Sequence, residues 1–111
     1  MLIAALLLAG ILGSVGIVVV DETGQELPGV TVEVLQQGQV ITRAFTSKEG
    51  AIEFTAIQPG TYFIRASLDG FRVQEVQALV SPLAPAEFRL VLPIESMLDY
   101  WLSMGVIPSF T

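Results

Sequence analysis

Short runs in which apolar and polar side chains alternate recur along most of this chain, and each ends in a turn that contains Gly or Pro. The run 30–34 is the clearest, because Val30, Val32 and Val34 alternate with Thr31 and Glu33. A period of two is typical of a β-strand with one buried face. Similar runs predict strands at 15–20, 40–46, 52–54, 62–67, 71–80 and 88–92. Seven short strands separated by frequent turns predict a mainly β fold, a seven-stranded antiparallel Ig-like sandwich.

The turns between these runs contain residues with defined backbone roles. Gly24, Gly50 and Gly70 stand where tight turns require a positive φ, which glycine adopts without steric cost. The Pro-Gly pair at 28–29 predicts a type II turn, and the sequence at 59–62 resembles a corner in which a tyrosine hydroxyl ties a loop to a sandwich edge. The residues predicted to define the fold are Gly24, Pro28, Gly29, Gly50, Pro59, Gly60, Tyr62 and Gly70.

Four turn-containing segments carry a family resemblance. They read GIVVVDETGQELPGVTV at 16–32, TSKEGAIEF at 46–54, PGTY at 59–62 and DGF at 69–71. In order and spacing they resemble the carboxypeptidase regulatory-like domain family over residues 14–92. The resemblance implies a transthyretin-like (prealbumin-like) sandwich. It also implies a non-catalytic role, because in this family the domain accompanies peptidases, adhesins and TonB-dependent receptors without catalysing a reaction itself.

The composition excludes several classes of site. Histidine, cysteine and asparagine are absent, so no Cys nucleophile, Ser-His-Asp triad, histidine-ligated metal or disulfide can form. The hydroxyisourate hydrolase with a similar fold uses a histidine cluster, and the Lys–Asn isopeptide bonds of related adhesin repeats need asparagine. A formal charge of −6 with only five basic residues argues against a nucleic-acid partner. We therefore expect no catalytic residue, no cofactor and no enzymatic activity.

Acidic side chains offer little sign of a metal site or a catalytic cleft. Asp21, Glu22 and Glu26 gather in the first loop, where their oxygens could bind Ca²⁺. A solvated acidic turn explains the same cluster, and we favour that interpretation. Glu33 and Glu75 are predicted to point outward from their strands, with no cleft between them. No metal site is predicted.

The first 20 residues contain no ionisable side chain, whereas all charged side chains lie from Asp21 onward. Such an apolar run can form a helix in a membrane or inside a protein complex, and we predict this segment at 1–13. Small residues on one face suit helix packing and larger ones on the other suit lipid: Ala5, Ala9 and Gly13, against Leu6, Leu7 and Ile11. The family resemblance implies that the first strand starts at about Gly16, which leaves a helix that is short for a lone span. A cleaved signal peptide and a helix buried in a soluble core are the alternatives.

Residues 93–111 follow the last predicted strand. Apolar side chains at helical spacing from Ile94 predict a short amphipathic helix that ends near Gly105. Adjacent Tyr and Trp side chains suit a protein interface or a membrane interface. The candidate interface residues are Met97, Tyr100, Trp101 and Met104. A helix folded over the open end of the sandwich is the alternative.

Two apolar ends around a compact domain indicate a bridging protein. We predict a non-catalytic structural subunit that stabilises a larger bacterial membrane complex, such as a photosynthetic or respiratory assembly. Its N-terminus would lie in the cytoplasm or the membrane and its sandwich in the periplasm. The expected partners are integral membrane subunits and membrane lipid, and contact with ligands or pigments of the complex is left open. The alternatives are a subunit of an extracellular filament and a cell-envelope module that binds a ligand or carbohydrate.

Overall fold

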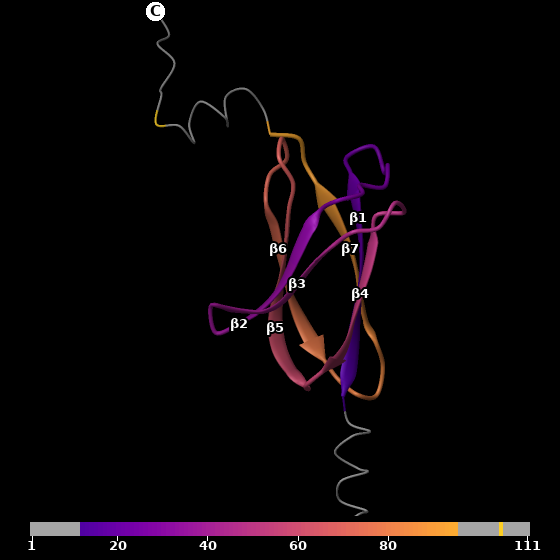
Figure 1. The fold of residues 1–111 in the computed structure, drawn as a ribbon, viewed down its shortest axis with the longest axis vertical. Coiled ribbons are helices and arrows are strands. Elements are labelled where there is room, and N and C mark those ends of the chain that lie inside the picture. Colours follow the sequence, from indigo (N-terminus) through magenta and orange to yellow (C-terminus); the bar gives the residue numbers. More distant parts are fainter. Residues whose placement is uncertain (1–11, 96–104, 106–111) are drawn as a thin grey trace, which may run out of the picture.

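The computed structural model describes residues 12–95 and Gly105, and this part of the chain forms a β-sandwich (Figure 1). Its seven strands are β1 (Gly13–Asp21), β2 (Thr31–Gln36), β3 (Gln39–Phe45), β4 (Ala51–Ile57), β5 (Gly60–Ser67), β6 (Gln74–Val80) and β7 (Ala86–Leu92). One sheet has the order β4-β1-β7 and the other the order β3-β2-β5-β6. The predicted sandwich is therefore confirmed, with strand positions close to those that the alternation indicates.

The core lies between the two sheets and is made of the inward-facing half of each alternating run. Val32 and Val34 on β2 and Ile64 on β5 are fully buried and belong to one cluster with Ile17 on β1 and Leu92 on β7. β-branched residues suit these positions because their stiff side chains pack well on a pleated surface. The period of two thus separates a filled interior from two outer faces that remain available for contacts.

One strand pair differs from the predicted antiparallel arrangement. β1 and β7 run parallel, in register from Val15 opposite Ala86 to Asp21 opposite Leu92. A tight hairpin forces two neighbouring strands to be antiparallel, but the chain between β1 and β7 contains the five other strands. The direction of this pair is therefore set by the overall path of the chain and not by any local turn.

The first strand begins at Gly13, two residues before the strand that the sequence pattern predicts at 15–20. Gly13 opens β1 and pairs with Ile57, so its assignment to a helix-packing face is wrong. A Cβ atom at this position would lie 2.6 Å from Val80 Cγ1 and 2.8 Å from the Ser81 carbonyl oxygen. Glycine has a low strand propensity, yet only glycine fits this close approach. The other predicted helix-packing and lipid-facing residues, Ala5, Leu6, Leu7, Ala9 and Ile11, lie outside the described residues.

The end of the described chain is also extended where a helix is predicted to begin. Ile94 forms a β-bridge with Phe71, and the Glu95 amide donates a 2.8 Å hydrogen bond to the Gly70 carbonyl. These backbone bonds hold Ile94 beside the loop before β6, so a helix starting there is wrong. They also explain why β6 begins at Gln74 and not at Phe71. Met97, Tyr100, Trp101 and Met104 lie outside the described residues.

Helices are not found in residues 12–95, and no helix in this range is long and apolar enough to cross a membrane. The positive φ that the turns require is present, at 88° for Gly24, 72° for Gly29, 70° for Gly50 and 87° for Gly70. The β2–β3 hairpin turns at Gln37 and Gly38, both with positive φ, which matches the twist of the flanking strands.

The tyrosine corner is present at the start of β5. The Tyr62 hydroxyl donates a 2.7 Å hydrogen bond to the Gln58 carbonyl, while the ring packs in the core. We expect Tyr62→Phe to lower the free energy of unfolding by about 1 kcal/mol, because it removes one hydrogen bond and leaves the carbonyl without that donor. Urea unfolding of both proteins measures the change, and an unaltered midpoint would show that the corner adds no stability.

Candidate functional site

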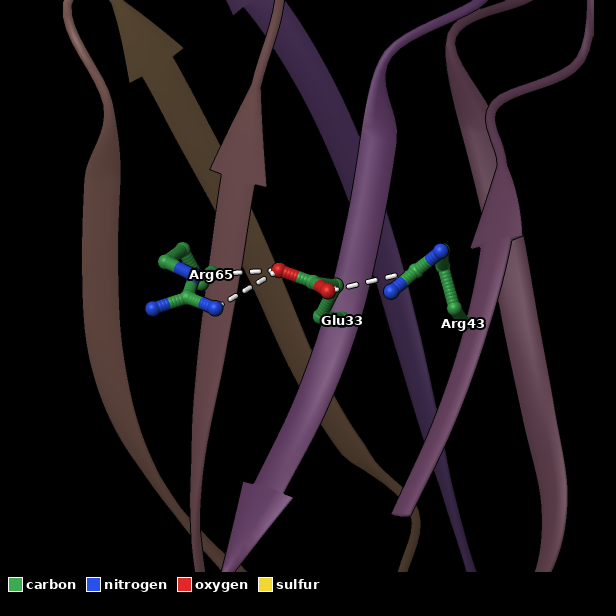
Figure 2. A network of polar contacts seen from close by, with 3 residues as sticks. All are labelled: Glu33, Arg43 and Arg65. Atoms are coloured by element: carbon green, nitrogen blue, oxygen red, sulfur yellow. Dashed lines mark hydrogen bonds and ion pairs between the residues drawn. The ribbon is translucent and has the colours of Figure 1, made fainter. Parts of the chain in front are cut away.

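A row of four charged residues crosses the outer face of the four-stranded sheet. Glu33 on β2 stands opposite Arg43 on β3 and Arg65 on β5, and Arg65 stands opposite Glu75 on β6. The charges therefore alternate in sign from one edge strand to the other. We call these four residues the charge row. Figure 2 shows its centre, where the Glu33 carboxylate lies between two arginines from the neighbouring strands.

Glu33 is the anchor of this row. Arg65 donates to Glu33 Oε1 from Nε at 3.0 Å and from Nη2 at 2.9 Å, and Arg43 Nε donates to Oε2 at 3.2 Å. The Glu33 side chain is only 11% exposed, whereas the arginines remain accessible to solvent. The sequence predicts an outward direction for Glu33, which is right, but not this degree of burial. The three hydrogen bonds fix the arginines in place on the sheet surface.

The same contacts set the protonation of Glu33. A hydrogen bond from Arg65, followed by the positive charges of Arg65 and Arg43, holds the pKa of the Glu33 carboxyl below its ordinary value, although partial burial acts in the opposite direction. The carboxylate is therefore charged at neutral pH and attracts both arginines.

This lowered pKa predicts how stability depends on pH. A depressed pKa stabilises the fold above the unfolded-state pKa of about 4.3, and that contribution is lost as pH falls through the folded-state value. We expect Glu33→Gln to lower stability by about 1 kcal/mol at neutral pH, and the two proteins to converge in acid. Thermal unfolding between pH 7 and pH 2 tests this, and a constant difference across that range would contradict it.

Apolar side chains flank the charge row on the same face. Phe63 on β5 and Val40 on β3 lie on one side of it, and Leu79 on β6 lies further along that side. Phe45 on β3 and Val73, just before β6, lie towards the other side. Leu79 is 71% exposed and Phe45 64% exposed, so both add exposed apolar area to this face. We call the charge row and these flanking residues the outer face.

Several hollows mark the described surface. Its hollows are open, and one is lined by Gly16, Glu53 and Glu87 on the outside of the three-stranded sheet. Another lies at the end of β5, where its lining includes Ser67 and, in the loop that follows, Asp69. The core between the two sheets is filled by side chains. Outside these hollows, the outer face presents ordered charges and exposed apolar side chains to its surroundings.

The acidic first loop is organised by its own hydrogen bonds. Asp21 Oδ1 accepts from the Thr23 amide and hydroxyl and from the Gln25 amide, at 2.6 to 2.9 Å. These bonds, led by the Thr23 hydroxyl, hold the pKa of Asp21 below its ordinary value. Glu22 instead accepts from the Ile94 amide at 3.1 Å. Among residues 12–95, no three potential ligands are grouped to hold a metal ion.

The sequence does not reveal the charge row directly. Glu33, Arg43 and Arg65 are separated by many residues, and each appears as an ordinary exposed charge within its run. Their alternation within the strands shows that they point outward. What places them in one row is the register between strands, which depends on the hairpin geometry and on the bulge between Val34 and Leu35.

Comparison with known families gives one match. The model of the carboxypeptidase regulatory-like domain matches residues 14–93, which includes all strands of the sandwich except the first residue of β1. A search of curated proteins returns no match to the sequence.

Solved structures with a similar fold come from several kinds of protein. A minor pilin of Streptococcus agalactiae superposes with a TM-score of 0.65 at 16% identity, over 89% of this chain and 48% of that one. The pilus 2b backbone protein of group B streptococcus gives 0.63 at 15% identity, over 78% and 42%. The 5-hydroxyisourate hydrolase of Klebsiella pneumoniae gives 0.59 at 16% identity, over 75% and 92%. The chain thus spans less than half of each pilin, and these likenesses show the fold alone.

Proposed function

Because the chain belongs to the carboxypeptidase regulatory-like domain family, we propose that it is a non-catalytic structural module of an extracellular filament. The observation that carries this proposal is the outer face, where large apolar side chains are exposed around charges that hydrogen bonds hold in position. Such a surface suits a protein partner, because an interface needs apolar contact area and fixed polar groups that set orientation.

The solved structures that share this fold favour a filament over other structural roles. Sandwiches of this shape occur in a pilus backbone protein and in a minor pilin, both of which are components of pili. The 5-hydroxyisourate hydrolase shares the fold, but this chain has no histidine with which to build a comparable cluster. A structural module needs only a stable domain and contact surfaces, and the described residues supply both.

A bridging subunit of a bacterial membrane complex is the second candidate. One sequence feature favours it, namely the absence of ionisable side chains in the 12 residues before β1, which suits the interior of a complex or a membrane. In that case the sandwich would lie in the periplasm and contact integral membrane subunits. The two candidates place the same domain in different assemblies.

Fractionation of native cells separates the two candidates. Shearing releases surface filaments, while mild detergent extracts intact membrane complexes, and an antibody against the chain detects it in either fraction. We expect the chain in the sheared fraction, as a polymer that includes many copies. Co-migration of the chain with a fixed set of integral membrane proteins would overturn the filament and support the bridging subunit. A chain that is released as a free monomer by washing would contradict both.

A further inference from the structure

The order of charges in the charge row has a symmetry that a second copy of the chain can match. Across the strand order β3-β2-β5-β6, the charges are positive at Arg43, negative at Glu33, positive at Arg65 and negative at Glu75. Reversing the order of the strands therefore exchanges every positive charge for a negative one. A surface with this property is complementary to its own reversed copy.

Face-to-face packing of two such sheets produces this reversal. When two identical sheets pack about a two-fold axis parallel to the strands, each strand lies over the strand at the mirrored position, so that β3 covers β6 and β2 covers β5. Arg43 then lies over Glu75 of the second copy, and Glu33 over Arg65. Packed sheets cross at about 30°, which displaces the edge strands most, and the length of arginine side chains spans that displacement.

The apolar residues of the outer face obey the same symmetry. On one side of the charge row, Phe63 on β5 lies opposite Leu35 on β2, which is only 7% exposed, so the two-fold axis places the exposed Phe63 of each copy over Leu35 of the other. Phe45 on β3 likewise lies over Val73, which precedes β6. Apolar area thus meets apolar area on both sides of the charge row. This contact would supply the affinity, while the charges would set the orientation.

We propose that two copies of this chain dock through their outer faces, related by a two-fold axis parallel to the strands of β3-β2-β5-β6. The inference goes beyond the proposed function, because a closed two-fold contact joins only two copies and neither requires nor produces a filament by itself. It concerns the purified chain and is therefore tested independently of where the chain is found in the cell.

Sedimentation velocity of the full chain in a mild non-ionic detergent, over a range of concentrations, tests the dimer. We expect a reversible monomer–dimer equilibrium at micromolar concentrations. Phe63→Lys should weaken dimerisation at least about tenfold, because it places a charge in the centre of the contact. Val91→Lys on β7 is the matched control: Val91 is 43% exposed on the other sheet and Phe63 is 42% exposed, so this variant should leave dimerisation unchanged.

A charge exchange distinguishes the dimer from an effect on the single domain. Glu75→Arg places a positive charge over Arg43 of the second copy and should weaken dimerisation about tenfold or more. Adding Arg43→Glu restores an opposite pair between the copies, although it places like charges side by side within each copy, next to Glu33 and Arg65. The double variant should therefore dimerise better than Glu75→Arg alone. Thermal unfolding of each variant confirms that the domain is folded.

Four results would overturn the proposal. A wild-type chain that remains monomeric at all concentrations would show that the outer face does not bind a second copy. Equal weakening by Phe63→Lys and Val91→Lys would move the contact elsewhere. A double variant that dimerises no better than Glu75→Arg would show that residues 43 and 75 of different copies do not pair. Growth into open polymers would show that the contact is not closed.

Discussion

Replacement of Gly50 by alanine is expected to lower the free energy of unfolding by about 3 to 5 kcal/mol. Gly50 lies between β3 and β4 with φ at 70°, a conformation that alanine adopts only with strain. The lack of space for a Cβ atom contributes more to the expected loss than the backbone strain does. A Cβ would lie 2.7 Å from the Val19 carbonyl oxygen and 2.9 Å from the Leu27 amide nitrogen. Both are backbone atoms of neighbouring segments, so neither can move aside cheaply.

The matched control for this variant is Gly38→Ala in the β2–β3 hairpin. Gly38 has a similar φ of 78°, but a Cβ there meets nothing within 4 Å. Gly38→Ala should therefore cost only the conformational strain, about 1 kcal/mol. Thermal unfolding compares the two, and we expect Gly50→Ala to lower the midpoint by roughly 12 to 24 °C. Equal losses for the two variants would show that the close approach at Gly50 does not contribute.

The second large effect is expected at Thr46, a buried polar residue between β3 and β4. Its hydroxyl donates a 2.7 Å hydrogen bond to the Leu27 carbonyl and accepts a 2.9 Å bond from the Val30 amide. These bonds tie the Pro28–Gly29 turn to the loop after β3. Thr46→Val keeps the shape of the side chain but removes both bonds and leaves two buried backbone groups without that partner. We expect a loss of about 2 to 3 kcal/mol.

Replacement of Thr46 by serine distinguishes the contribution of the hydroxyl group to stability from that of the methyl group. Thr46→Ser retains both hydrogen bonds and loses one buried methyl, so it should cost only about 1 kcal/mol. Urea unfolding of the two variants gives the comparison. If Thr46→Ser were as damaging as Thr46→Val, packing of the methyl group would account for the stability and the hydrogen bonds would not.

The glycines at positions 38 and 50 show how far the sequence alone defines the fold. The alternation of apolar residues locates the strands because each strand buries one face, and the turn glycines locate the hairpins because few other residues adopt positive φ. Gly38 and Gly50 nevertheless look alike in the sequence. Only the packing of β1 and the Leu27 segment around Gly50 makes one of them irreplaceable. The early start of β1 at Gly13 has the same origin, a close approach to Val80 and Ser81 from a distant strand.

The sequence predicts the candidate site less well than it predicts the fold. The predicted interface residues Met97, Tyr100, Trp101 and Met104 were chosen for their chemical type and lie outside the described residues. The charge row consists of ordinary charges, and its meaning depends on which strands are neighbours and in which register. Local alternation places Glu33 on an outer face, but the pairing of β2 with both β3 and β5 places it between two arginines.

The parallel pairing of β1 and β7 has a mechanical consequence. Because the two strands run in the same direction, β1 begins at one end of the sandwich and β7 finishes at the other. A pulling force applied through the backbone at Gly13 and Leu92 would therefore act along the strands. All the hydrogen bonds between β1 and β7 would then bear the load together in shear, whereas a hairpin pulled from its open end would unzip one bond at a time. This geometry therefore resists extension along the direction of the strands.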